Sequence, residues 1–222
     1  MRTLVRFLIP LGLTCLAVAA PRHIVRFGAG MPVELFLGPS ETKSEKIEVR
    51  GLYVDSRLRD FTTGEPHEVT DRLFTVRKAY RLNDSLPDDA KKIPRWRWQR
   101  GGWLLVDRGS GRVSTLNLPK FDAYYSGASW YRDYVAYCGV SDNGEKLYAV
   151  VAQIGAKKPV VLKEIGAAHA KEEPESQCAV PKWQRDPMQV TFEPAGAAPV
   201  SFLVQGRSAD AAAPENAEAT KD

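Results

Sequence analysis

Two runs of β-forming residues, Tyr134–Cys138 and Lys146–Val151, flank an Asn143-Gly144 pair. Asn-Gly between two such runs is the strongest short-range signal for a β-hairpin, because both residues tolerate the left-handed backbone that tight hairpin turns need. A third run, Pro159–Lys163, follows the next turn. Strands joined by short turns pair as antiparallel neighbours. This part of the chain therefore predicts an antiparallel β meander.

The same pattern occurs earlier in the chain. Ile47–Val54 begins with alternating apolar and polar residues, which is typical of a half-buried strand. Leu73–Leu82 is rich in β-branched and aromatic residues, and its many bases favour an exposed strand. Trp103–Leu116 predicts a second hairpin, which turns through glycines, and polar loops are expected over residues 39–46 and 87–92. No segment shows a sustained helical period with caps at both ends, so we expect a mainly β fold of antiparallel meander or blade-like sheets.

The predicted turn also carries a resemblance to a known family. The segment Ser141–Tyr148 (SDNGEKLY) resembles the Ser-Pro-Asp-Gly-Lys-x-Leu turn of TolB-type β-propeller repeats, with Asp142 where the family has Pro. The flanking strands and the Trp103–Leu116 hairpin are similar to blade strands, so the resemblance covers residues 96–165. It implies one blade-like sheet more than a closed ring, because a propeller needs at least four blades of ~40 residues. Propellers host many functions, so the resemblance assigns none.

The first nineteen residues have the pattern of a secretory signal peptide. Two arginines precede an apolar run, Leu8–Val18, and small residues at Ala17 and Ala19 precede a cut before Ala20. The apolar run is shorter than the ~20 residues that a membrane-spanning helix needs. We therefore predict a signal peptide over residues 1–19 and a secreted or periplasmic protein with no permanent membrane span. A retained N-terminal helix is the alternative.

One domain is predicted over residues 20–205, between the predicted signal peptide and a C-terminal segment of different composition. After Gln205 the composition changes to Ala, Glu, Asp and Pro, without aromatic residues. Such a segment cannot bury enough apolar surface to offset the entropy of ordering it. Residues 206–222 are therefore predicted to be a disordered tail.

Signal cleavage would remove Cys15 and leave only Cys138 and Cys178. An even pair in an exported chain predicts a disulfide, and two buried, unpaired thiols are the alternative. Two cysteines without histidines at ligand spacing do not make a tetrahedral metal site. The lone Gly28-Ala29-Gly30 is not a dinucleotide-binding motif. We expect neither a metal nor a cofactor.

Two aromatic-rich segments, Arg95–Trp103 and Phe121–Tyr137, are candidate binding surfaces. In a strand through Arg95–Trp103, alternation puts Trp96 and Trp98 on one face and Arg97 on the other. Indoles stack on sugar rings or bases, and guanidiniums bind anionic groups. The alternative for both segments is that the aromatic side chains form the core. The predicted ligand-binding residues are Trp96, Arg97, Trp98, Trp103, Tyr124, Tyr125 and Trp130.

Signals for catalysis are weak. The three histidines are far apart, and no serine lies in a Gly-x-Ser-x-Gly elbow. We therefore predict an exported, non-catalytic binding or interaction protein whose partner is a glycan or another exported protein. The alternative is an exported hydrolase that acts on polysaccharide or cell-wall material with a carboxylate pair drawn from Asp107, Asp122 and Asp133. A formal net charge of +4 is too small to indicate nucleic acid as the main partner.

Overall fold

The computed structural model describes residues 23–37, 43–85, 95–168 and 178–204. The predicted signal peptide lies outside these ranges, and so do the predicted tail and the loop predicted over residues 87–92. No helix within the described ranges is long and apolar enough to cross a membrane. The prediction of one domain over residues 20–205 stays a prediction.

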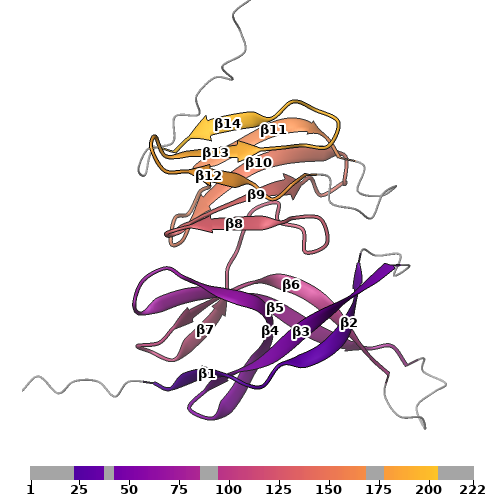
Figure 1. Cartoon of the computed structure of the whole chain (residues 1–222), viewed down its shortest axis with the longest axis vertical. Helices are drawn as coiled ribbons and strands as arrows, with labels where there is room; N and C mark the ends of the chain where they lie inside the picture. Colours follow the sequence, from indigo (N-terminus) through magenta and orange to yellow (C-terminus); the bar gives the residue numbers. More distant parts are fainter. Residues whose placement is uncertain (1–22, 38–42, 86–94, 169–177, 205–222) are drawn as a thin grey trace, which may run out of the picture.

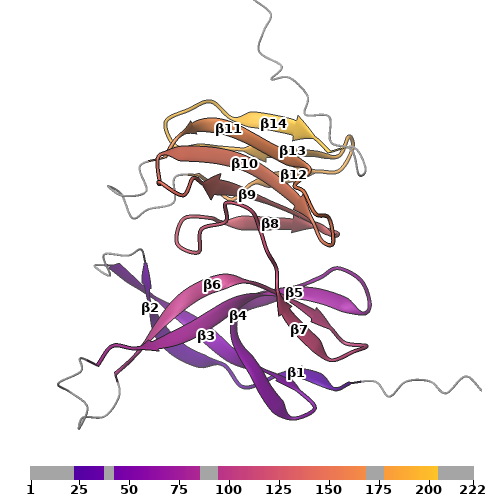
Figure 2. The ribbon, with the colours of Figure 1, turned by 180° about the vertical axis from the view of Figure 1, so that it is seen from behind.

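The described ranges are built from strands and turns without an α-helix, which confirms the predicted mainly β fold. In chain order the strands are β1 (Val25–Phe27), β2 (Met31–Leu37), β3 (Lys43–Val54), β4 (Arg57–Glu68), β5 (Leu73–Asn83), β6 (Trp96–Asp107), β7 (Arg112–Thr115), β8 (Ala128–Tyr131), β9 (Tyr134–Val140), β10 (Lys146–Gln153), β11 (Val161–Ala167), β12 (Lys182–Gln184), β13 (Gln189–Phe192) and β14 (Val200–Leu203). Figure 1 shows two halves along the long axis, with β1–β7 below and β8–β14 above. Seen from behind in Figure 2, the segment after β7 rises between the halves to β8.

The seven strands of the lower half form one sheet, in which five strands close into a ring. β3 pairs with β2 on one side and with β4 on the other, and β4, β5 and β6 follow as antiparallel neighbours. β2 then meets β6 in parallel, with Leu35 opposite Trp98. A meander with an odd number of strands must close through a parallel pair, which explains this contact. β1 and β7 extend the sheet beyond the ring by pairing with β3 and β6.

An apolar cluster lies on one face of the lower sheet. Its fully buried members come from β3, β5 and β6, where register places Phe74 opposite Val106 and Val76 opposite Leu104. Partly buried side chains of β1 and β7 pack against them. The cluster contains Leu52, Phe74, Val76, Leu104 and Val106, with Val25, Phe27 and Val113 against it. At the start of Ile47–Val54, Val49 is buried and Glu48 is exposed, as the alternation predicts, whereas Leu52 and Val54 are buried on the opposite face of the strand.

β5 is buried on both faces over most of its length, so the prediction of an exposed strand there is wrong. Phe74 and Val76 face the apolar cluster, while Thr75 and Arg77 are buried on the opposite face. Only the last three residues, from Arg81 onward, are exposed. β5 is central because it pairs with both β4 and β6, and Phe121 and Ala123, from the segment between β7 and β8, contact Arg77 on its second face. The basic residues of Leu73–Leu82 do not indicate from the sequence that another segment covers this face of the strand.

β3 begins at Lys43, inside the range where a polar loop is predicted. Lys43 pairs with Leu37, and the register continues without a break to Val49 opposite Met31. The exposed polar side chains of Ser44 and Lys46 alternate along this strand. A strand with a solvent-facing side accepts such residues, so their polarity is a poor guide to where the strand starts.

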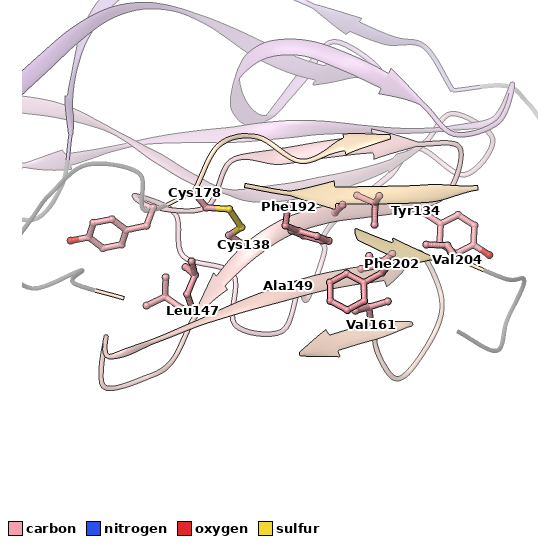
Figure 3. Close-up of a cluster of buried hydrophobic side chains, with 14 of the residues drawn as sticks. Tyr134, Cys138, Leu147, Ala149, Val161, Cys178, Phe192, Phe202 and Val204 are labelled. Carbon is pink, nitrogen blue, oxygen red and sulfur yellow. A yellow bond between two sulfur atoms is a disulfide. The ribbon is translucent and has the colours of Figure 1, made fainter. Parts of the chain in front are cut away.

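The upper half contains two antiparallel sheets with a common core. β8–β11 form a meander in the order β11-β10-β9-β8, which agrees with the meander predicted from Tyr134 onward, and β12–β14 form a three-stranded sheet. Buried side chains of both sheets meet between them, among them Cys138, Phe192 and Phe202 (Figure 3). A disulfide joins Cys138 to Cys178, whose Cα atoms lie 6.2 Å apart. The predicted disulfide is therefore confirmed.

The turn predicted at Asn143-Gly144 connects β9 to β10. The N–H of Ser141 donates to the carbonyl of Lys146 at 2.9 Å, and the N–H of Gly144 donates to the carbonyl of Ser141 at 2.8 Å. Gly144 has a φ of 77°, a left-handed conformation that residues with a Cβ adopt at a cost. The predicted hairpin is confirmed, and its glycine has a conformational reason.

The two segments that resemble propeller strands lie in different sheets. The Trp103–Leu116 hairpin contributes to β6 and β7 of the lower sheet, whereas the strands from Tyr134 onward belong to the upper half. The resemblance to TolB-type repeats stays a prediction.

Candidate functional site

Aromatic and guanidinium side chains of β4, β5 and β6 stack on one another at the surface of the lower sheet. The Cζ atom of Arg81 lies 4.6 Å from the ring centroid of Trp96 and 5.7 Å from that of Phe61. Phe61 contacts Trp98 edge to face, with ring centroids 5.1 Å apart. We call these four residues, Phe61, Arg81, Trp96 and Trp98, the aromatic patch.

Strand register explains why these four side chains meet. Arg81 lies opposite Trp98 across β5 and β6, so both side chains leave the sheet on the same face, and alternation adds Trp96 to that face. Phe61 lies opposite Ala79 across β4 and β5. Because Ala79 is small and fully buried, the rings of Phe61 and Trp98 can meet over it. The predicted pairing of Trp96 and Trp98 on one face is confirmed.

The aromatic patch combines an open ring with an exposed cation. Trp96 is 50% exposed, and Arg81 is exposed as well. The guanidinium of Arg81 lies over two rings, and its N–H groups form a planar fork. An indole presents an apolar surface for stacking, and a guanidinium fork binds carboxylate, sulfate or phosphate oxygens. The patch can therefore hold a ring that bears an acidic group.

Arg97 lies on the opposite face of β6, as alternation predicts. Its Nε donates to a carboxylate oxygen of Asp84 at 2.7 Å, so its charge is already balanced. Of the three predicted residues at the start of β6, the structure therefore brings Trp96 and Trp98 together and sets Arg97 apart.

Trp103 shares the face of Trp98, although its odd position in the sequence predicts the other face. The register shifts between Arg77 and Ala79, which pair with Trp103 and Arg100 respectively. β6 thus has one extra residue here, at Gly101-Gly102. A Cβ at Gly101 would lie 3.1 Å from the side chain of Lys78, so a glycine avoids a tight contact at this bulge. The bulge turns Trp103 toward the upper half.

Trp103 and Trp130 form the junction between the two halves. Their ring centroids lie 5.1 Å apart with an interplanar angle of 69°, and the His67 ring stacks on the Trp130 ring with centroids 5.5 Å apart. The Nε2 atom of His67 makes a 2.7 Å hydrogen bond with the carbonyl of Arg132. Both predicted binding tryptophans therefore contact other parts of this chain, and they hold its halves together.

Arg77 is the charged residue of this junction and is only 8% exposed. Its Nη2 donates to the carbonyl of Ala123 at 2.9 Å, and its Cζ lies 4.7 Å from the Phe121 ring. Burial lowers the pKa of the Arg77 guanidinium to about 9. Its Nε and the indole N–H groups of Trp103 and Trp130 have no hydrogen-bond partner within the described structure. Ring stacking, more than hydrogen bonding, therefore holds the junction.

Tyr124 and Tyr125 lie in a loop that packs on the core of the upper half. The Oδ1 atom of Asp122 accepts hydrogen bonds from the N–H groups of Tyr124 at 2.8 Å and Tyr125 at 3.2 Å. Tyr125 is buried in the core cluster, and Tyr124 packs against that cluster partly buried. Burial raises the pKa of the Tyr125 hydroxyl above its ordinary value. Their placement agrees with the alternative of a structural role.

The three carboxylates of the hydrolase alternative have structural partners. Asp107 accepts two hydrogen bonds from Arg72, at 2.5 and 2.6 Å, which hold the pKa of the Asp107 carboxyl far below its ordinary value. A general acid needs a raised pKa, so Asp107 is poorly suited to that role. Asp122 caps its loop, and Asp133 accepts from Gln153 at 2.8 Å. Among the described residues, no group of three His, Cys, Asp or Glu side chains could hold a metal ion.

Two members of the aromatic patch were not predicted from the sequence. Phe61 belongs to β4, a strand with a charge-rich start that was not predicted, and Arg81 belongs to β5, for which the sequence predicted an exposed strand but no neighbouring strand. The antiparallel register of β5 and β6 places Arg81 opposite Trp98. The sequence does not predict this register, because no tight turn between the two strands fixes it.

Comparisons of this chain with protein-family models, curated proteins and solved structures found no match. Its function must therefore be inferred from the side chains themselves. The aromatic patch is the best candidate, because it combines an exposed stacking surface with an exposed cation.

Proposed function

We propose that this chain is an exported, non-catalytic binding protein that holds an acidic glycan on the aromatic patch. The observation that supports this most is the half-exposed Trp96 ring with the Arg81 guanidinium 4.6 Å from its centroid. A sugar ring would stack on the indole, and a uronate or sulfate group on that sugar would accept hydrogen bonds from Arg81.

Two further features support export. The Cys138–Cys178 disulfide is typical of proteins in oxidising compartments. The first nineteen residues have the sequence pattern of a cleaved signal. Mass spectrometry of protein from the native cell should find a chain that begins at Ala20. Full-length chain starting at Met1 in the cytosol would contradict export.

A glycan array tests the ligand class. We expect the wild-type protein to bind glycans that carry uronate or sulfate groups. Trp96→Ala should weaken this binding about tenfold, because each stacked ring contributes on the order of 1–3 kcal/mol. Arg81→Gln should remove the preference for acidic over neutral sugars.

Leu82→Ala is the matched control. Leu82 is also exposed, but it follows Arg81 and points from the other face of β5. This variant should bind as the wild-type protein does. An empty array, or equal binding by Trp96→Ala and Leu82→Ala, would remove the basis of the glycan proposal. Capture of one exported protein partner that depends on Trp96 would replace the glycan with a protein ligand.

A further inference from the structure

A second surface, independent of the aromatic patch, lies between β4 and β7. A groove of about 300 Å³ opens there, with Arg59 on one side and Arg112, Ser114 and Thr115 on the other. The buried Leu104 and the half-buried Val113 also line it. We call this site the arginine groove.

The two arginines of the groove form no salt bridge within the described ranges. The side chains of Arg59 and Arg112 make neither an ion pair nor a hydrogen bond with another described residue. Asp55 lies near Arg59, but its carboxylate already accepts from His23 at 2.7 Å and from the N–H of Ile24 at 3.0 Å. Both guanidinium forks are therefore available to a ligand.

Asp60 is the acidic residue of the groove, and its charge is already balanced. One carboxylate oxygen accepts from Lys78 Nζ at 2.8 Å, and the other accepts from the N–H of Phe61 at 2.9 Å. The groove consequently carries a net positive charge from Arg59 and Arg112. This positive charge would attract a negatively charged group.

The groove also offers neutral hydrogen-bond donors. Ser114 and Thr115 contribute hydroxyl groups. β7 pairs with β6 alone within the described sheet, so its other edge is open. The N–H of Leu116 donates to the carbonyl of Trp103 at 2.8 Å, and antiparallel alternation then directs the N–H groups of Val113 and Thr115 to the open edge.

We propose that the arginine groove binds an oxyanion: a carboxylate, sulfate or phosphate group on a small molecule. Arg59 and Arg112 line the groove from different strands, a guanidinium fork matches the oxygens of such a group, and hydroxyl and edge N–H groups add further donors. A volume of about 300 Å³ is at the small end of ligand sites, which suits one acidic molecule. None of the four residues of the aromatic patch lines the arginine groove, so the two sites are separate.

Calorimetric titration with inorganic phosphate, sulfate and glucuronate tests the proposal, with glucose as the uncharged control. The wild-type protein should bind at least one of these oxyanions saturably, below about 10 mM. Binding by phosphate and sulfate alone would identify a free inorganic ion as the ligand. Stronger binding by glucuronate would identify the acidic group of an organic molecule.

The double variant Arg59→Gln/Arg112→Gln should weaken oxyanion binding about tenfold or more. Arg57→Gln is the matched control, because it removes an exposed positive charge from the same strand outside the groove. Both variants should stay folded, since all three arginines are exposed. An equal loss in Arg57→Gln would show a general charge effect and overturn the proposal, and so would the absence of binding by all three probes.

Amide NMR locates the bound ion without a variant. Phosphate or glucuronate should shift the N–H signals of Val113 and Thr115 in the wild-type protein, and the same shifts should persist in Trp96→Ala. Shifts confined to the aromatic patch would contradict the arginine groove while leaving the glycan proposal in place. Absence of glycan binding, together with the expected shifts at β7, would contradict the glycan proposal and leave the arginine groove in place.

Discussion

Trp96 and Trp130 are both predicted binding residues, but their surroundings differ. Trp96 is 50% exposed beside Arg81, whereas Trp130 contacts both Trp103 and His67 at the junction of the two halves. Trp130→Ala should therefore reduce the free energy of unfolding by about 3 kcal/mol, because it empties a packed site. Trp96→Ala should cost less than about 1 kcal/mol, as exposed residues usually do. Urea unfolding of both variants checks this, and similar losses would contradict the assignment of junction and surface.

Asp107 should determine part of the stability lost in acid. Hydrogen bonds from Arg72 hold its folded-state pKa below the unfolded value of about 3.9. Such a carboxylate stabilises the fold above the unfolded pKa, and this contribution is lost as pH falls below about 4. Asp107→Asn should lower the melting temperature at neutral pH and flatten its fall between about pH 4 and pH 2.

Melting curves measured by circular dichroism at a series of pH values test this prediction. Asp142→Asn is the control, because Asp142 also pairs with a base, Lys120, but is 92% exposed. The melting temperature of Asp142→Asn should fall with decreasing pH as steeply as that of the wild-type protein. An Asp107→Asn variant that loses stability in acid as steeply as the wild-type protein would show that another carboxylate is responsible.

At the scale of the element, the β9–β10 hairpin depends on one glycine. Gly144→Ala should reduce the free energy of unfolding by about 1 kcal/mol, since alanine adopts the φ of 77° only with strain. Gly166→Ala in β11 is the matched control, because its added Cβ would meet no atom within 4 Å and its φ is not left-handed. The control should change stability little in urea unfolding. Equal effects at both positions would contradict the conformational argument.

β5 shows which properties of an element its own residues do not predict. The β-branched and aromatic residues of Leu73–Leu82 predict a strand, and that prediction is confirmed. Its exposure is predicted wrongly, because Arg77 is buried by Phe121 and Ala123, which lie more than forty residues later. Strand propensity is local, whereas burial depends on partners that are distant in sequence.

At the scale of the whole molecule, the disulfide links the two sheets of the upper half. Cys138 lies on β9, and Cys178 bridges to Pro194 beside β13. Since the cysteines are separated by 40 positions in the sequence, reduction should lower the free energy of unfolding by about 4 kcal/mol, because the unfolded chain gains entropy. Urea unfolding with and without reductant measures this.

The Cys138→Ala/Cys178→Ala variant should behave like the reduced protein and should not respond to reductant. Mass spectrometry of the unreduced wild-type protein should find the linked peptide. Free thiols in exported material would contradict the pairing.

The amino-acid sequence was sufficient to predict the strands with clear alternation, the Asn143-Gly144 turn and the pairing of two cysteines. These features depend on backbone preferences within a few residues, or on the count of one residue type. The three-dimensional fold was needed to show that β2 closes a ring on β6, and that Trp96 stays at the surface while Trp103 is packed at the junction. Trp96 and Trp103 belong to the same strand, β6. Their exposure differs because of a bulge and of neighbours that are distant in the sequence, and local periodicity contains no information about either.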